Sequence, residues 1–310
     1  MSRRNLAYIA VCTALATNAS AADWYPSRYG ATDTLGAANN LSAEKVLAAA
    51  RLVKTGKTYS LGVQTGPDSP AYPPRRYSIT VLQPAPGAAG LIGSNHATGN
   101  DDLLLTWMGI GSQLDGLGHM GIENVYYNGN KAEDFVAVTG LKKLGTNTIP
   151  PLVSRGVLLD MVKLVGKKPE AGTAFNRTQI QAAANAAKVS IEKGDVVLLH
   201  TGWLDVADTD KTRFMAGEPG LGVDGAAYLA SLGVVAVGAD NWAVEVLPHE
   251  DPKQGFPVHV ELLAKNGVYI LENMDTRALA ADGATEFLFV LGQPKFVGAV
   301  QAVINPIAIR

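Results

Sequence analysis

The 310-residue sequence has little cysteine and no excess of positive charge, and each shortage excludes a class of protein. The single cysteine, Cys12, cannot form a disulfide framework or a cysteine-rich zinc module. The formal net charge is −2, from 26 Lys and Arg against 28 Asp and Glu, and there is no basic run, so no nucleic-acid partner is expected. Because 47% of the residues are hydrophobic, wholesale disorder is also excluded.

The N-terminus has the pattern of a secretory signal peptide over residues 1–21. Arg3 and Arg4 precede a short apolar stretch, and Ala19-Ser20-Ala21 supplies a small-x-small cleavage site. We therefore expect a periplasmic or secreted protein whose mature domain spans residues 22–310. No later run is long and apolar enough to span a bilayer, so no membrane association is expected after cleavage. The mature chain would contain no cysteine.

Helical patterns alternate with short apolar strands along the mature chain, which is typical of an α/β fold. Ser42 can cap a helix over residues 43–54, and another helix is expected from about 178 to 191. The apolar run 196–199 is typical of a buried central strand. Other strands are expected at 57–64, 76–83, 157–160, 234–238, 268–271 and 286–290, and other helices at 225–231 and 257–264. No linker or repeat divides the chain, so we expect a single compact domain.

The densest group of reactive side chains lies in the glycine-rich segment 109–119, which we predict to be a loop. Asp115 and His119 are four residues apart, and Gln113 is two residues before Asp115. The glycines would let the loop fold sharply and bring these side chains together. A carboxylate and an imidazole held in this way could share a divalent metal. The alternative is an ordinary glycine-rich turn with a solvated aspartate.

A second group brackets one predicted helix and the strand that follows it. His259 would lie in the first turn of the helix, and Glu272 at the end of the strand. Both side chains could reach a site at the strand ends, where α/β sheets usually bind ligands. Taken singly, each residue also fits a structural role, as a hydrogen-bonded helix histidine or a strand-end cap.

Further polar and aromatic residues follow the predicted central strands and could line a pocket for a small-molecule substrate. These candidates are Trp107, His200, Asp240 and Trp242. Asp240 and Trp242, with Glu245 nearby, follow the strand 234–238 and would therefore meet the other strand ends at one edge of the sheet. Large aromatic residues are more often part of a core than of a pocket. His96 and His249 lie in polar stretches and are expected at the surface.

The segment Gly111-Ser112-Gln113-Leu114-Asp115-Gly116-Leu117-Gly118-His119 resembles the signature His-x-Gly-Thr-His-x-Asp-x-x-x-His of the cyclase-like metal-dependent hydrolases. This is the family of bacterial kynurenine formamidase and isatin hydrolase. Residues 194–203, which end in Thr-Gly-Trp, are similar to another landmark of the family, as are Asp240-Asn241 and the pair His259 and Glu272. The resemblance implies a single compact α/β domain of the swivelling β/β/α (cyclase-like) type, usually assembled as a homodimer or homotetramer.

The resemblance also implies an activity, the hydrolysis of a small amide, lactam or ester by a metal-activated water. Asp115, His119 and Glu272 match family positions that bind or surround a divalent metal. His259 matches a nearby catalytic-site histidine, and His119 would act as general acid and base.

The chain departs from the signature at two positions, because Gly109 and Gln113 replace histidines. Glycine has no ligating side chain, and glutamine offers only a neutral amide oxygen. One metal held by Asp115, His119 and Glu272, helped by Gln113, is the expected arrangement. Since this set is rich in oxygen, Mn²⁺ is as well suited to it as Zn²⁺. The same departures leave open a small-molecule binding protein that has lost its metal, and a lyase that uses His119 without hydrolysis.

Overall fold

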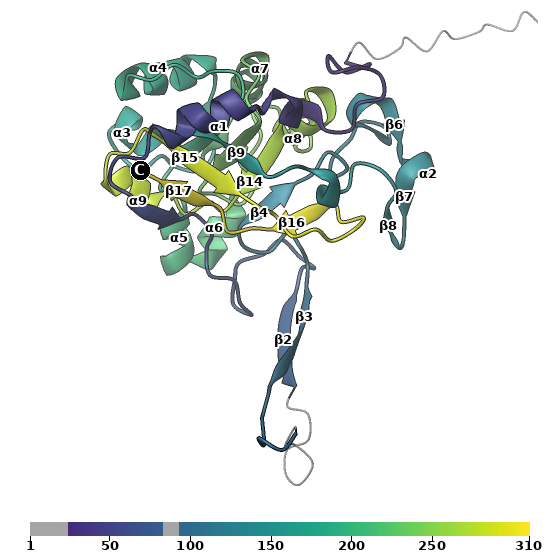
Figure 1. Cartoon of the computed structure of the whole chain (residues 1–310). Helices are drawn as coiled ribbons and strands as arrows, with labels where there is room; N and C mark the ends of the chain where they lie inside the picture. Colours follow the sequence, from purple (N-terminus) through teal and green to yellow (C-terminus); the bar gives the residue numbers. More distant parts are fainter. Residues whose placement is uncertain (1–23, 83–92) are drawn as a thin grey trace, which may run out of the picture.

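The computed structural model describes residues 24–82 and 93–310, so the predicted signal peptide lies outside the described residues. A nine-stranded mixed sheet forms the centre of the domain (Figure 1), in the order β1-β17-β15-β9-β11-β13-β14-β4-β16. Its strands are β1 (Thr58–Ser60), β4 (Gln113–Asp115), β9 (Leu152–Asp160), β11 (Val196–His200), β13 (Ala236–Ala239), β14 (Tyr269–Glu272), β15 (Glu286–Leu291), β16 (Gln301–Val303) and β17 (Ile307–Ile309). The predicted α/β fold is confirmed.

The middle of the sheet is parallel and fully buried. Strands β9, β11, β13 and β14 are parallel neighbours, whereas β4 pairs antiparallel with both β14 and β16. Val196–Leu199 has no exposed residue, as its continuous apolar sequence predicts for a strand covered on both faces. The carboxyl ends of these parallel strands therefore lie together at one edge of the sheet, and β4 lies next to β14.

Helices cover the sheet, with α1, α4 and α7 above it in the view of Figure 1 and α5 and α9 below it. The helices are α1 (Ala43–Ala50), α3 (Met161–Val165), α4 (Arg177–Ala187), α5 (Leu204–Thr209), α6 (Lys211–Ala216), α7 (Val223–Ser231), α8 (Pro257–His259) and α9 (Arg277–Ala281). Ser42 caps α1 as predicted, because its hydroxyl accepts a hydrogen bond from Lys45 N at 3.2 Å. Helix α4 ends earlier than predicted, because Lys188 adopts the left-handed conformation, with φ of 56°.

Short elements complete the domain around this sheet. They are the helix α2 (Ala132–Phe135), the strands β5 (Val125–Tyr126), β6 (Asn130–Lys131), β7 (Val136–Ala137), β8 (Gly140–Leu141), β10 (Ala174–Phe175) and β12 (Gly220–Leu221), and the turns η1 (Gly36–Asn40), η2 (Tyr127–Gly129), η3 (Thr146–Thr148) and η4 (Val260–Lys265). The predicted helix 257–264 is thus divided into α8 and the π-helical turn η4.

Two predictions about strands are wrong. The segment 109–119 is not a loop throughout, because Gln113–Asp115 form β4 between β14 and β16. The sheet also does not end at residues 286–290, since β16 and β17 follow. Strands of three residues are too short to show a period in the sequence, and neighbours distant in the chain define them.

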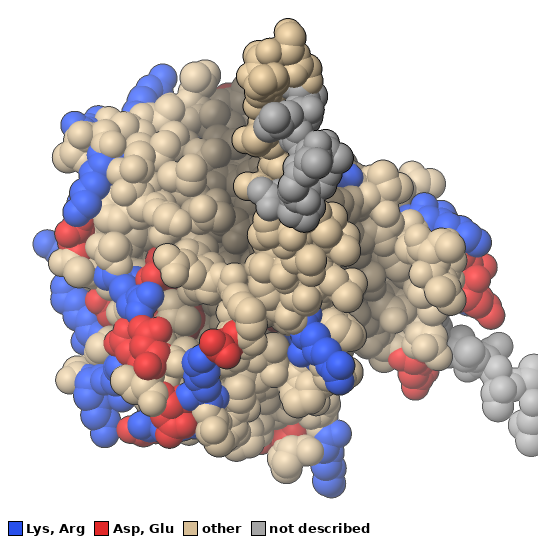
Figure 2. All heavy atoms as spheres, turned by 90° about the horizontal axis from the view of Figure 1, so that it is seen from below, with Lys and Arg blue, Asp and Glu red and all other residues tan. Residues whose placement is uncertain are grey.

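Strands β2 (Tyr77–Leu82) and β3 (Asp101–Thr106) pair with each other and form an arm that projects from the domain (Figure 1). Apolar side chains are exposed along the arm, namely Ile79, Val81, Leu82, Leu103, Leu104 and Leu105. Figure 2, which views the molecule from below, shows charges of both signs intermixed on one side of the domain and few charges beside the arm. Within residues 24–82 and 93–310, no helix has the length and apolar character that crossing a membrane requires.

Candidate active site

The antiparallel pair of β4 and β14 brings together two segments that are far apart in the sequence. Gln113 lies opposite Glu272 in the register, and Asp115 lies opposite Ile270. Because side chains alternate along a strand, Gln113 and Asp115 share one face, and Leu114 between them is buried on the other. His119 follows β4 by four residues, and His259 ends α8. All five polar residues of both predicted groups therefore come from neighbouring elements.

Asp115, His119 and His259 form a cluster that could hold a metal ion, since their ligand atoms all lie within 4.8 Å of one another. Asp115 Oδ2 is 3.6 Å from His259 Nε2 and 4.0 Å from His119 Nε2. Both distances are too long for a hydrogen bond. The cluster joins one oxygen and two imidazoles, a donor set that suits Zn²⁺ or Mn²⁺.

Two buried oxygen atoms in this cluster have no hydrogen-bond partner among the described residues, Asp115 Oδ2 and Gln113 Oε1. The other oxygen of Asp115, Oδ1, accepts a hydrogen bond from Gln301 Nε2 at 2.7 Å. A buried carboxylate oxygen without a partner is costly unless a cation compensates it. The residues present therefore fit a divalent metal bound at Asp115 Oδ2, and the Gln113 amide oxygen is available beside it.

Glu245 fixes the orientation of His259. Its carboxylate accepts a hydrogen bond from His259 Nδ1 and also lies 3.3 Å from the backbone N of Val258. His259 Nε2 consequently faces Asp115 and Glu272, with Glu272 Oε1 at 3.2 Å. An imidazole held by a carboxylate on one nitrogen presents the other nitrogen as a ligand or proton carrier.

The pKa values of these groups are perturbed by burial and by one another. Burial lowers the pKa of His119. Burial and the negative charge of Asp115 raise the pKa of Glu272 to about 7. Burial opposes the protonation of His259, but the surrounding carboxylates of Asp115, Glu245 and Glu272 raise its pKa well above the usual value. Perturbed titrating groups in one cluster are typical of active sites.

A cavity of about 140 Å³ opens onto the cluster. It is lined by Tyr72, Arg75, His119, Met120, Trp242, Ala243, Phe256, His259 and Glu272. Trp242 is held in the wall by its backbone N–H, which donates to Glu218 at 2.9 Å, and by its indole N–H, which donates to Phe214 O at 3.0 Å. The cavity thus combines apolar walls with the titrating groups of the cluster.

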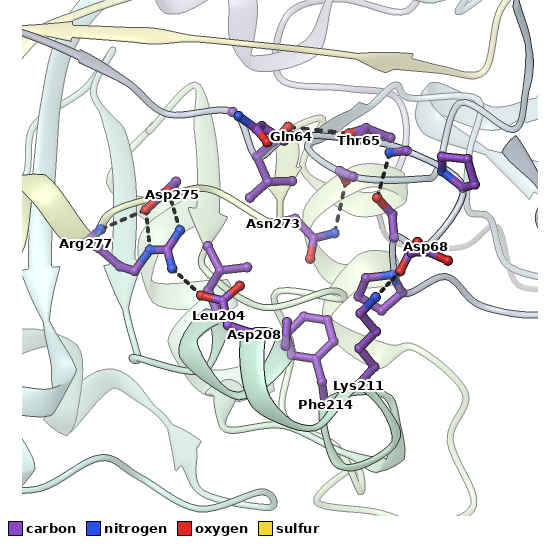
Figure 3. Close-up of a pocket in the computed structure, with 18 of the residues that line it drawn as sticks. Gln64, Thr65, Asp68, Leu204, Asp208, Lys211, Phe214, Asn273, Asp275 and Arg277 are labelled. Carbon is purple, nitrogen blue, oxygen red and sulfur yellow. Dashed lines mark hydrogen bonds and ion pairs between the residues drawn. The ribbon is translucent and has the colours of Figure 1, made fainter. Parts of the chain in front are cut away.

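A larger cavity of about 720 Å³, drawn in Figure 3, lies beside α5 and α6 and does not contain the cluster. Most of its charged side chains already have polar partners. Arg277 contacts Asp275 at 2.6 Å and Asp208 at 2.7 Å, and Lys211 Nζ donates to Asp68 O at 2.6 Å. The smaller cavity is therefore the candidate active site, because of the two it is the one that reaches His119, His259 and Glu272.

The sequence profile of the Cyclase family, described as "Putative cyclase", matches residues 59–246, which is more than half of the chain. The chain belongs to the Cyclase family. A solved structure described as a novel cyclase is 30% identical and superposes with a TM-score of 0.81 over 91% of this chain and 98% of its own. A search of the curated proteins gives no match.

More distant Cyclase-like structures share the fold. An isatin hydrolase bound to the product analogue thioisatinate is 19% identical, with a TM-score of 0.62 over 86% of this chain and 98% of its own. A predicted metal-dependent hydrolase from Bacillus stearothermophilus is also 19% identical, with a TM-score of 0.55 over 82% and 98%. These similarities confirm the cyclase-like fold that the signature implied.

In this Cyclase-family chain, three of the predicted pocket residues do not line the cavity. Trp107 is exposed after β3. His200 contacts Thr276 Oγ1 at 2.8 Å and Asp240 at 3.2 Å. Both carboxylate oxygens of Asp240 accept hydrogen bonds from the turn after β11, from Thr201 and Gly202. The polar atoms of Asp240 and His200 therefore stabilise that turn. Trp242 is the one predicted pocket residue that lines the cavity.

The prediction that His249 lies at the surface is wrong, whereas His96 is exposed as predicted. His249 Nδ1 lies 3.3 Å from Glu245, the residue that orients His259. Residues that the sequence did not indicate also belong to the site, among them Tyr72, Arg75, Phe256 and Gln301. Tyr72 and Arg75 come from a proline-rich loop, which carries no pattern that could assign them to the site.

Proposed function

We propose that this protein is a metal-dependent hydrolase. Its substrate would be a small linear or cyclic amide, in which it cleaves the C–N bond, or the corresponding ester. The observation that carries the proposal is Asp115 Oδ2, which is buried beside two imidazole nitrogens and accepts no hydrogen bond from the residues that the structure describes. The isatin hydrolase and the metal-dependent hydrolase among the similar structures support it.

Asp115, His119 and His259 would hold the metal, with Gln113 Oε1 and Glu272 beside it. When bound, the metal would activate a water molecule and polarise the carbonyl group of the substrate. Gln301 fixes one oxygen of Asp115, and Glu245 fixes one nitrogen of His259. The remaining atoms of both side chains are thereby oriented toward the cluster.

Glu272 lines the cavity and can move protons. A pKa of about 7 lets Glu272 take up and release a proton near neutral pH. His119 has its pKa lowered by burial, so its imidazole stays neutral at the same pH and keeps its lone pair for the metal. We propose that Glu272 serves as the general acid and base as the nitrogen leaving group departs.

Hydrolysis of a panel of anilides, lactams and esters tests the proposal, with each product identified by mass. Chelation of the metal, Asp115→Asn and His119→Ala should each reduce turnover by about a hundredfold or more. His96→Gln removes an exposed histidine outside the cluster and should have no effect. Full activity after chelation would contradict the proposal. A product that lacks the added water would identify a lyase, and binding without turnover would identify a binding protein.

We also propose that the protein is exported and forms a homo-oligomer. Residues 1–21 support export, and N-terminal sequencing of the protein from the periplasm or medium tests it. The arm of β2 and β3 supports self-association, because an isolated two-stranded hairpin is at best marginally stable in water and this one exposes apolar side chains. The strands of the arm carry two acidic residues and no lysine or arginine, which disfavours binding to an anionic lipid surface. We therefore propose that a second copy of the chain covers the apolar side chains of the arm.

A further inference from the structure

Arg75 occupies the space that a side chain at position 109 would need. Its guanidinium donates a hydrogen bond to Gly109 O, and a Cβ atom at Gly109 would lie 2.5 Å from Arg75 Cζ. No side chain could be placed there unless the guanidinium moved. The glycine that replaces the first histidine of the signature thus leaves space for an arginine that enters from a loop distant in the sequence.

The charge of Arg75 is directed at the candidate active site. Arg75 lines the same cavity as His119 and Glu272, and its positive charge contributes to lowering the pKa of both groups. Among residues 24–82 and 93–310, Gly109 O is the only hydrogen-bond partner found for the guanidinium, and no carboxylate pairs with it. A half-buried arginine without an acidic partner suits a bound anion, because two parallel N–H groups match a carboxylate.

The other cavity residues leave room for the apolar part of such a ligand. The ring centroids of Tyr72 and Trp242 lie 6.0 Å apart. The rings of Phe256 and His259 pack in a T-shaped arrangement, with their centroids 5.3 Å apart. Met120 and Ala243 complete an apolar wall.

We propose that Arg75 is a specificity-determining residue that selects substrates carrying a carboxylate, and that Tyr72, Trp242 and Phe256 hold their apolar body. The proposal rests on the proposed hydrolase function for the identity of the reaction. The recognition itself concerns only binding. It can therefore be tested with non-reacting ligands.

Binding of benzoate and of its neutral analogue benzamide to the full-length protein, measured by calorimetry, tests the proposal. The wild-type protein should bind benzoate more tightly, and Arg75→Gln should reduce that preference by about tenfold or more. Arg75→Lys keeps the charge and should retain part of the preference. Arg76→Gln removes the neighbouring, exposed arginine and should leave it unchanged. A thermal melt of each variant confirms that it is folded.

An equal affinity of the wild-type protein for the two ligands, or a preference that survives in Arg75→Gln, would overturn the proposal. The titrations are run with Mn²⁺ present and after chelation, because a carboxylate could also bind a metal. A preference that depends on Arg75 in both conditions supports the anion site whether or not the metal is catalytic. A preference that depends on the metal and not on Arg75 contradicts this assignment and leaves the proposed hydrolase intact.

Discussion

Gln113 and Glu272 are register partners on β4 and β14, and the Gln113 amide donates a hydrogen bond to the Glu272 carboxylate. The same nitrogen lies 3.4 Å from Asp115 Oδ1. One neutral side chain thus bridges two buried carboxylates that would otherwise repel each other. This relationship explains how glutamine can replace a signature histidine without disrupting the cluster.

Gln113→Leu keeps the volume of the side chain and removes this bridge. The metal-free protein should lose about 1–3 kcal/mol of unfolding free energy, because two buried carboxylates lose a donor. Mn²⁺ should restore part of the loss. Chemical denaturation with and without the metal measures both effects, and Gln254→Leu at an exposed position is the control. A Gln113→Leu protein as stable as the wild type would show that the bridge has no energetic role.

Glu245→Gln tests whether the orientation of His259 matters for the site. The amide cannot reproduce the charged partner of His259 Nδ1, so metal affinity or kcat should fall by about tenfold to a hundredfold while the protein remains folded. Metal titration and steady-state kinetics measure the two quantities. Glu170→Gln, at an exposed ion pair with Arg213, is the matched control. Unchanged kinetics and metal affinity would mean that Glu245 serves only the packing of α8.

The effect of metal on stability should depend on pH through Glu272. Its folded-state pKa is raised from 4.5 to about 7, so the metal-free fold loses stability as the pH rises toward 7. Metal binding instead requires the deprotonated ligands and strengthens as the pH rises. The increase in Tm on adding Mn²⁺ should therefore be larger at about pH 8 than at about pH 6. Differential scanning calorimetry measures it, and an increase that is equal at both values or larger in acid would refute the assignment.

The arm should be required for self-association. Leu103 and Leu105 share one face of β3 and are 60% and 72% exposed, so Leu103→Glu with Leu105→Glu places two charges on the proposed contact. Light scattering after gel filtration should show a dimer or tetramer for the wild type and a monomer for the double variant. Leu47→Glu, on the exposed face of α1, should leave the oligomer intact. A wild-type monomer, or an oligomer that the double variant preserves, would exclude the arm as the interface.

The central fold and half of the site could be predicted from local sequence. Val196–Leu199 is a continuous apolar run, and Asp115 and His119 are close in the chain, so both features leave a signal in a short window. The residues that hydrogen-bond to the site residues leave no such signal in the local sequence. Gln301 reaches Asp115 from β16, and Glu245 reaches His259 from the loop after β13. Only the pairing of distant strands and loops brings them together, and the three-residue strand β4 itself exists because β14 and β16 flank it.

The position of a residue in the sequence also did not identify which polar side chains line the cavity. Asp240 and His200 follow central strands, as active-site residues often do, yet their polar atoms are used to hold the turn at Thr201 and Gly202. Arg75 carries no local pattern and still reaches the cavity, because Gly109 leaves it space. Whether a polar residue at a strand end is structural or reactive depends on which partners the fold provides.

Calorimetric titration of the metal-free protein with Mn²⁺ and Zn²⁺ is the most direct test of the proposed metal centre, because it requires no substrate. We expect saturable binding of one ion per chain, at least tenfold weaker in Asp115→Asn and unchanged in His96→Gln. Absence of binding by the wild-type protein, or equal binding by Asp115→Asn, would contradict the assignment of Asp115, His119 and His259 as a metal centre.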